Sequence, residues 1–212
     1  MNIIFSLLVL LFSAIIHEIS HGYVAERLGD PTARLAGRLT LNPIKHIDPM
    51  MSVLLPLLLL FSGSPIIFGA AKPVPVDPFN LKEGRKDMAL VALSGPLVNI
   101  ILAILASILF RLLPLASSAL PIFLTSILYV FLSTVITINL LLAIFNLLPI
   151  PPLDGSKVFS LILPEKEASL YLSLGSFGMF ILFFLLLFPF GGFSLMNLVS
   201  NLLNFSLNLL LR

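Results

Sequence analysis

The stretch "AIIHEISHGYVAERLG", residues 14–29, decides how this chain is interpreted. It places His17, Glu18 and His21 in the continuation of an apolar run that begins at Ile3. Ionisable side chains inside a bilayer are energetically costly, and where they occur they usually serve a function. The rest of the sequence must therefore show whether the run lies in a membrane and which chemistry the three side chains support.

The composition predicts an integral membrane protein. Of 212 residues, 58% are hydrophobic and only 10% are charged, whereas soluble domains have about 25% charged residues. This leaves no room for a separate soluble domain, so we expect one domain over 1–212. A formal charge of +2 is too small to suggest nucleic acid binding, so no nucleic acid partner is expected, and the absence of cysteine excludes thiolate metal ligands and a cysteine nucleophile.

The apolar segments indicate an all-α polytopic membrane protein. A helix of about 20 apolar residues crosses a bilayer, and about five to six transmembrane helices are expected. The segment 50–71 is apolar but contains Pro56, Gly63 and Pro65, so it is predicted to be a re-entrant segment or a tight hairpin. The uninterrupted segments are 3–25, 88–112, 121–148, 172–189 and 193–211.

Two short membrane-associated β-strands are also predicted. Polar and apolar residues alternate over 33–40, which is typical of a strand. The segment 69–78 contains Pro73, Pro75 and Pro78, which exclude a regular helix and favour extended backbone.

The orientation follows from the positions of the basic residues. The helices 3–25 and 121–148 both deliver polar motifs at their carboxyl ends, so they run in parallel and 88–112 runs the opposite way. On this arrangement only Arg111 lies away from the motifs. Because basic residues gather on the cytoplasmic side, we expect a multi-pass cell-membrane protein with its site toward the cytoplasm. The residues expected on that side are Arg27, Arg34, Arg38, Lys45, Lys72, Lys82, Arg85, Lys86, Lys157, Lys166 and Arg212.

The three side chains of the opening stretch form an H-E-x-x-H pattern. His17 and His21 are four residues apart, which places them about 40° apart around a helix and one turn apart along it. Two such histidines can bind one Zn²⁺, and the adjacent Glu18 can take a proton from the metal-bound water, whose pKa zinc lowers to about 7. The alternative is a structural polar cluster without a metal.

A catalytic zinc usually has a third protein ligand. Asp154 is the favoured candidate, because it follows an apolar helix and lies in the turn sequence "PPLDG", residues 151–155. His46 and Asp48 are the alternatives, although Pro43 and Pro49 beside them also suit a plain turn.

Three ordered motifs together resemble the site-2 protease family of intramembrane zinc metalloproteases. They are "HEISHG" at 17–22, "SGPLVN" at 94–99 and "NLLPIPPLDG" at 146–155. The stretch "NPIKHIDP" at 42–49 is similar to that of compact members in which the H-E-x-x-H helix comes first. The chain shows no PDZ or CBS domain, so we expect the compact form.

The resemblance implies one zinc ion per chain, bound by His17, His21 and Asp154, with Glu18 as the catalytic base. It implies that the substrates are transmembrane segments of membrane proteins, which are cut within the bilayer. It also maps a substrate-holding asparagine onto Asn146, although this residue could instead bond across helices.

Other features leave open questions of role and class. Asn99 and Asn139 are expected to be helix-packing residues. A zinc transporter and a non-catalytic scaffold that binds transmembrane segments are the alternative functions. A transporter needs a polar path across the whole membrane, and only Arg111 is ionisable near the far side. The oligomeric state is not predicted.

Overall fold

A computed structural model of the chain describes residues 3–47, 72–116, 120–189, 191–192 and 194–211, together with the single positions 54 and 61. The predicted re-entrant segment 50–71 lies almost wholly outside these residues. The helical elements are α1 (Ile3–Leu28), α2 (Thr32–Leu35), η1 (Pro43–His46), η3 (Pro78–Asn80), α4 (Arg85–Ala116), α5 (Ile122–Asn146), α6 (Asp154–Phe159), η4 (Ser160–Ile162), α7 (Glu165–Ser173), α8 (Gly175–Leu187) and α9 (Leu195–Leu211).

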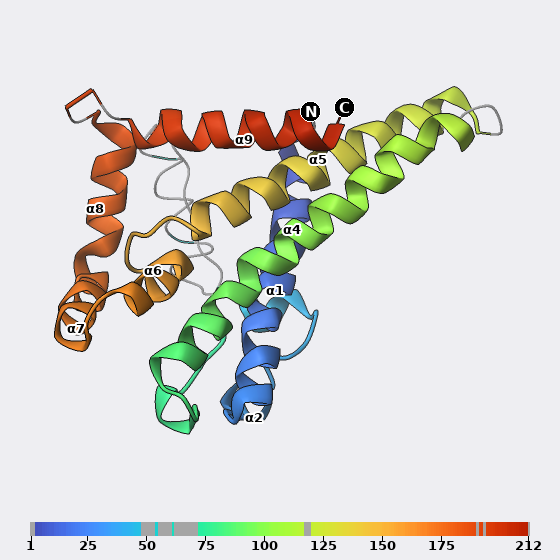
Figure 1. The fold of residues 1–212 in the computed structure, drawn as a ribbon. Coiled ribbons are helices and arrows are strands. Elements are labelled where there is room, and N and C mark those ends of the chain that lie inside the picture. The colour runs from blue at the N-terminus through green and yellow to red at the C-terminus, as the bar shows by residue number, and fades with distance from the viewer. Residues whose placement is uncertain are drawn as a thin grey trace.

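Three helices of the described chain are long and apolar enough to cross a membrane: α1, α4 and α5. The long helix α4 packs against both α1 and α5, and the three form the centre of the molecule (Figure 1). The short helix α6 packs against α4 near its amino-terminal end. This arrangement brings the end of α1, the start of α4 and α6 together.

The buried face of α1 follows from its sequence. Val9, Ser13, His17, His21 and Ala25 are all buried and recur every fourth residue. Successive residues at this spacing are about 40° apart around the helix, so together they form a continuous stripe that turns slowly around α1. The face that carries the two histidines is therefore the face that packs inside the protein. The rest of α1 carries mainly apolar side chains.

The prediction of about five to six transmembrane helices is not confirmed, because the described residues contain three helices of sufficient length and hydrophobicity, or four if a bent pair forms one span. The predicted span 172–189 is divided between α7 and α8, which meet at an angle of 66°, so they count as one broken span at most. Helix α9 has 17 residues, shorter than the roughly 20 that a straight crossing needs.

Helix α9 also does not return the chain to the side of the motifs. Arg111, near the far end of α4, donates from Nη2 to the carbonyl oxygen of Leu209 (2.8 Å) and from Nε to that of Leu210 (3.1 Å). The carboxyl end of α9 thus lies beside Arg111, and the expectation that 193–211 crosses back is wrong. Residue Arg212 itself lies outside the described residues.

The predicted strands are not found in the part of the chain that the structure describes. The strand at 33–40 is wrong, because Thr32–Leu35 forms helix α2 and a turn follows at Gly37. Residues 72–77 are irregular and are followed by the 3₁₀ turn η3. Burial over 33–40 does not follow the alternation of the sequence, because Ala33 is fully buried whereas Leu35 is exposed.

Away from the motifs, α4, α5 and α9 are joined by apolar packing. The buried members of this far core are Ala103, Ala106 and Leu113 of α4 and Leu132, Ile136 and Leu140 of α5. Leu203 and Leu207 of α9 pack against the same group. Small alanines let α4 and α5 approach closely, which is the usual way that helices associate in a bilayer.

Candidate metal centre

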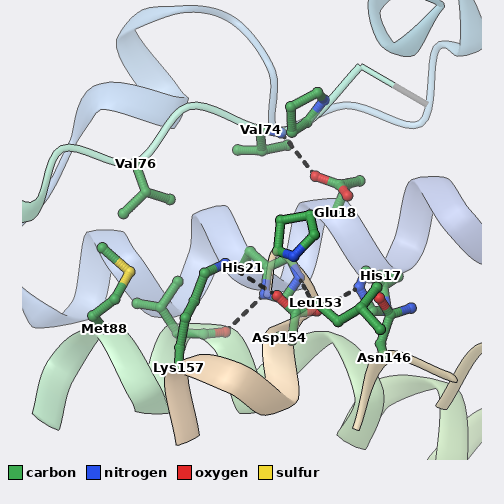
Figure 2. Close-up of a pocket in the computed structure, with 13 residues that line it drawn as sticks. His17, Glu18, His21, Val74, Val76, Met88, Asn146, Leu153, Asp154 and Lys157 are labelled. Atoms are coloured by element: carbon green, nitrogen blue, oxygen red, sulfur yellow. Dashed lines mark hydrogen bonds and ion pairs between the residues drawn. The ribbon is translucent and has the colours of Figure 1, made fainter. Parts of the chain in front are cut away.

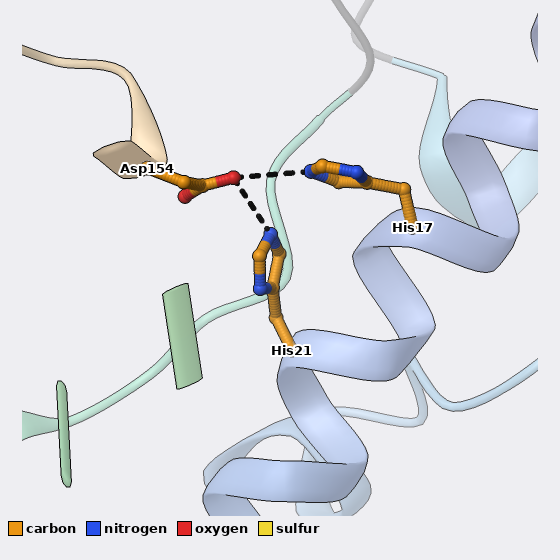
Figure 3. Close-up of side chains that lie close together, drawn as sticks. All are labelled: His17, His21 and Asp154. Atoms are coloured by element: carbon orange, nitrogen blue, oxygen red, sulfur yellow. Dashed lines mark hydrogen bonds and ion pairs between the residues drawn. The ribbon is translucent and has the colours of Figure 1, made fainter. Parts of the chain in front are cut away.

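Three buried side chains from two distant parts of the chain meet at one point. The Oδ2 atom of Asp154 lies 3.1 Å from Nε2 of His17 and 3.2 Å from Nε2 of His21 (Figure 3). Their possible ligand atoms all lie within 4.8 Å of one another, and all three residues are buried. The structure therefore brings together the three residues that the sequence nominated as metal ligands.

Helix α4 can pass close to the two histidines because residue 95 is glycine. A Cβ atom at Gly95 would lie 2.5 Å from Nε2 of His17 and 2.5 Å from Cε1 of His21. Such distances are far shorter than a van der Waals contact. The absent side chain thus leaves the space in which the histidine rings stand.

Asp154 is placed by the turn between α5 and α6. It is the first residue of α6, and the turn folds back so tightly that a Cβ atom at Gly155 would lie 2.2 Å from the carbonyl oxygen of Leu147. Only glycine fits there. The sequence "LDG" thus presents the carboxylate toward α1 immediately after α5 ends.

Each histidine is held from its other ring nitrogen. The Nδ1 atom of His21 lies 2.7 Å from the carbonyl oxygen of Val91, and the Nδ1 atom of His17 lies 2.6 Å from Oδ1 of Asn99. A carbonyl oxygen only accepts, so Nδ1 of His21 carries the hydrogen and its Nε2 presents a lone pair in the neutral ring. Metal-binding histidines typically have such a partner on the second nitrogen.

The donor set fits a zinc ion. Two imidazole nitrogens and one carboxylate oxygen are the ligands of many catalytic zinc sites, and donors bound tetrahedrally at 2.0–2.2 Å are roughly 3.3–3.6 Å apart. The spacings of 3.1 and 3.2 Å between Asp154 and the histidines are close to this range. An Nε2 lone pair that faces a carboxylate oxygen at such a distance needs a proton or a metal ion between the two atoms, and a single zinc ion would serve both histidines.

Glu18 lies beside these three residues but is not one of the group. Its Oε2 atom accepts a hydrogen bond of 2.8 Å from the backbone N–H of Val74, which crosses above α1 (Figure 2). This bond fixes one carboxylate oxygen and leaves the other to accept from a further donor. A half-buried carboxylate next to the ligand group is suited to take up a proton.

A cavity of about 400 Å³ opens onto the three ligands (Figure 2). Glu18 lines it, as do Asn146 and Lys157. The Nζ atom of Lys157 lies 3.2 Å from Oδ1 of Asp154, so the two oxygens of Asp154 face different partners. The side-chain amide of Asn146 donates one hydrogen bond to the carbonyl oxygen of Leu142 (3.0 Å), and its other polar groups are available to the cavity.

The alternative third ligands are not brought to this point. His46 is buried in a separate place, where its Nε2 atom donates to the carbonyl oxygen of Thr40 at 2.8 Å. Among the described residues, His17, His21 and Asp154 lie close enough together to hold a metal ion, and His46 is not part of that group. Asp48 lies outside the described residues.

Several residues of the site were missed by sequence reasoning. Asn99 was expected to be a packing residue but contacts His17 directly. Lys157 was used only as a topology marker, and the carbonyl of Val91 carries no sequence signal. Asn99 could have been found, because it lies one helical turn after Gly95 in an otherwise apolar helix and an intramembrane amide needs a partner.

A buried group of two histidines and one carboxylate with a glutamate beside it is typical of the metal-dependent hydrolases. Comparison with known proteins agrees. The model of "Peptidase family M50" matches residues 117–189. The Bacillus subtilis (strain 168) protein named "Putative zinc metalloprotease YwhC" is 36% identical over 191 residues, which cover 90% of this chain and 84% of that protein.

More distant relatives cover a shorter part of the chain. The protein named "Putative zinc metalloprotease Rip2" is 35% identical over 147 residues in Mycobacterium tuberculosis (strain ATCC 25618 / H37Rv). Its counterpart in Mycolicibacterium smegmatis is 33% identical over 145 residues. Each alignment covers 68% of this chain and 52% of the relative. None of the solved structures matches the chain.

The chain belongs to peptidase family M50, the site-2 protease family. The resemblance drawn from the three sequence motifs is thus confirmed, and with it the prediction of an intramembrane metalloprotease rather than a zinc transporter or a scaffold.

Proposed function

We propose that this protein is a zinc metalloendopeptidase that hydrolyses peptide bonds within or near transmembrane segments of other membrane proteins. The observation that supports this most is the meeting of His17, His21 and Asp154 in one cavity with Glu18 at its wall. We take residues 1–212 as one protease domain, in a multi-pass membrane protein.

One zinc ion per chain would be held by Nε2 of His17, Nε2 of His21 and Oδ2 of Asp154. When bound, Zn²⁺ polarises a peptide carbonyl and makes a water molecule more acidic. Lys157 neutralises the second oxygen of Asp154, which leaves Oδ2 as the oxygen that faces the histidines.

Glu18 acts as the general base. It takes a proton from the attacking water, whose oxygen forms a bond with the carbonyl carbon of the substrate. The C–N bond then breaks, and Glu18 passes the proton to the leaving amine, so that one peptide bond and one water yield a carboxylic acid and an amine, which then ionise to a carboxylate and an ammonium group. The N–H of Val74 holds Glu18 in place for both transfers.

Asn146 is the proposed substrate contact. It lines the cavity at the end of α5, eight residues before Asp154, and its side-chain amide can donate to a substrate carbonyl. A transmembrane helix hides its peptide bonds in i to i+4 hydrogen bonds. The substrate must therefore be unwound locally before its backbone reaches Asn146.

A substrate that added as a strand along 72–76 would need free backbone N–H groups there, and the structure leaves few. The N–H of Lys72 donates to the carbonyl oxygen of His46, and that of Val74 donates to Glu18. Pro73 and Pro75 have no N–H group. At most one amide of this stretch remains for a substrate, so the segment acts as a wall of the cavity, which Pro73, Val74 and Val76 line.

The cytoplasmic side is proposed for the site because basic side chains gather at its end of the helices. Arg34 pairs with Glu26 just beyond the last turn of α1, and Arg85 at the start of α4 donates to the carbonyl oxygens of Ser160 and Leu163. Basic residues are retained on the cytoplasmic face of membrane proteins.

Cleavage of a model transmembrane substrate in detergent tests the proposal. Glu18→Gln is expected to lower the rate about 10²- to 10⁴-fold while zinc remains bound. Glu26→Gln is the matched control, because Glu26 lies on the same helix as Glu18 but pairs with Arg34 away from the cavity. This variant should cleave the substrate normally. Full activity of Glu18→Gln would refute the mechanism.

A further inference from the structure

A continuous series of hydrogen bonds between buried polar side chains links α1, α4 and α5 and ends at His17. Asn99 and Asn139 are both completely buried, and Ser13 is nearly so. The side-chain Nδ2 of Asn99 lies 2.7 Å from Oδ1 of Asn139, and the Nδ2 of Asn139 lies 2.9 Å from Oγ of Ser13. Three helices thus contribute one polar residue each to a line that ends on a proposed zinc ligand.

Backbone carbonyl groups fix the donor and the acceptor of each hydrogen bond in this series. The Nδ2 atom of Asn139 is 2.9 Å from the carbonyl oxygen of Val135, which can only accept. The amide of Asn139 must therefore point its NH₂ group there and its oxygen toward Asn99. A reversed amide would place two oxygens against each other in a buried site, which is unfavourable because neither can donate a hydrogen bond.

The same reasoning then fixes Asn99. Its NH₂ group must face the oxygen of Asn139, and it also lies 3.5 Å from the carbonyl oxygen of Ser13. Its own oxygen consequently faces Nδ1 of His17 at 2.6 Å. An acceptor at that position requires that Nδ1 of His17 carry the hydrogen, so that the lone pair of the neutral ring is on Nε2.

We propose that Asn99 and Asn139 are positioning residues that set the tautomer and ring orientation of His17 for zinc binding. Asn99 acts directly on the ring, and Asn139 acts through Asn99. We call the hydrogen-bonded series from Asn139 through Asn99 to His17 the relay. This inference rests on the proposed function, because the relay acts on the same zinc site. His21 needs no such relay, since its Nδ1 atom is held by the carbonyl of Val91, which cannot turn around.

The two histidines thus receive the same tautomer by different means. A backbone carbonyl fixes His21, whereas a side-chain amide that could rotate by 180° would fix His17 only if something else fixed the amide. Asn139, anchored to its own helix at Val135, supplies that second fixation. This explains why two asparagines, costly in an apolar bilayer, lie together on α4 and α5.

Zinc affinity measured by competition with a chromophoric chelator separates a positioning role from packing. Asn99→Leu removes the acceptor and should lower affinity about 10- to 100-fold, as loss of an outer-shell partner typically does. Asn99→Asp keeps an acceptor on Nδ1 and should bind zinc within a few-fold of wild type, although its thermal stability falls. Asn139→Leu should lower affinity less than Asn99→Leu, and Asn201→Leu, on the exposed face of α9, should not change it.

Nitrogen-15 NMR of the histidine rings gives a readout that packing alone would not move. The chain has only three histidines. His46, bonded through Nε2 to a carbonyl, and His21, bonded through Nδ1 to one, are internal references for the two tautomers. The Nδ1–H signal of His17 should be present in wild type, shifted downfield in Asn99→Asp and lost in Asn99→Leu.

The outcomes separate the relay from the proposed function. Wild type that binds no zinc would refute the zinc site, and the Nδ1–H signal of His17, recorded with and without zinc, would still test the relay. The relay is refuted if Asn99→Asp loses as much affinity as Asn99→Leu, or if His17 carries its hydrogen on Nε2. If Asn99→Leu fails to fold, Asn139→Leu tests the same tautomer.

Discussion

The two ends of the central helices are built in different ways. At the site end, α1, α4 and α6 meet through single atoms: Oδ2 of Asp154 faces two ring nitrogens, and Oδ1 of Asn99 faces another. At the far end, α4 and α5 meet through apolar side chains such as Ile136 and Ala103. Helix α4 continues through both regions.

This difference teaches where substitutions should matter. Apolar contacts in the far core are numerous and each is small, so the loss of one methyl group is spread over many neighbours. At the site end each polar atom has one or two partners, so the loss of one contact is not compensated by others. We therefore expect metal binding to depend on the site end and overall stability to depend on both.

The largest effect is expected from Gly95→Ala. The new methyl group would overlap both histidine rings, since a Cβ atom at this position would lie 2.5 Å from an atom of each ring. Because two ligands move at once, zinc affinity should fall by more than about 100-fold, beyond the usual effect of one outer-shell change. Chelator competition measures this, and wild-type affinity in Gly95→Ala would show that α4 does not confine the rings.

Asp30 is the next test, because it holds the end of α1 without touching the zinc site. It is completely buried and accepts hydrogen bonds from the side chain and N–H of Thr32, from Asn80 and from the N–H of Asp77. Asp30→Asn should lower the free energy of unfolding by about 1.5–3 kcal/mol, the scale of hydrogen bonds to a charged group. Zinc affinity should be unchanged.

The contribution of Asp30 should also depend on pH. Burial alone would raise its pKa, but the hydrogen bonds from Thr32, Asn80 and Asp77 outweigh burial and lower the pKa below the ordinary aspartate value. The stabilisation is therefore fully present above pH about 4 and is lost as pH falls through the lower folded-state pKa. Thermal melts of wild type and Asp30→Asn should converge in that acidic range, and a constant difference would contradict this.

Lys157→Met is expected to have a smaller effect on the metal. It removes the ammonium group that lies 3.2 Å from Oδ1 of Asp154 but keeps the length of the side chain. Zinc affinity should fall about 10-fold, the lower end of outer-shell effects. Lys157→Arg should retain most of the affinity, and an equal loss in both variants would assign Lys157 a role other than charge.

The smallest effect is expected from Ile136→Val in the far core. The side chain is completely buried between α4 and α5, and removal of one methylene should cost about 0.5–1.5 kcal/mol of stability. Zinc affinity should equal that of wild type. A matching drop in zinc affinity would mean that the two ends are coupled, contrary to the comparison above.

The sequence predicted the parts of this molecule that depend on local spacing. The H-E-x-x-H pattern placed His17 and His21 on one helix face, and the turn around Asp154 indicated the third side chain, which the structure brings to the same point. Three long apolar segments were also predicted as helices and are α1, α4 and α5. In each case the signal lies within a few residues of the feature.

The rest depends on contacts between distant segments and was missed or wrong. Alternation over 33–40 was interpreted as a strand, but Thr32–Leu35 forms helix α2, whose Ala33 is buried while its Leu35 is exposed. No local rule shows that α9 ends beside Arg111. The role of Asn99 depends on which helices lie side by side, which composition and periodicity do not define.

Metal analysis of the purified protein tests the central claim most directly. Wild type should contain one zinc per chain, Asp154→Asn should contain almost none, and His46→Ala should keep its zinc, because His46 is bonded to Thr40 away from the site. Retention of a full equivalent of zinc by Asp154→Asn, together with its loss from His46→Ala, would contradict the assignment of His17, His21 and Asp154 as the zinc ligands.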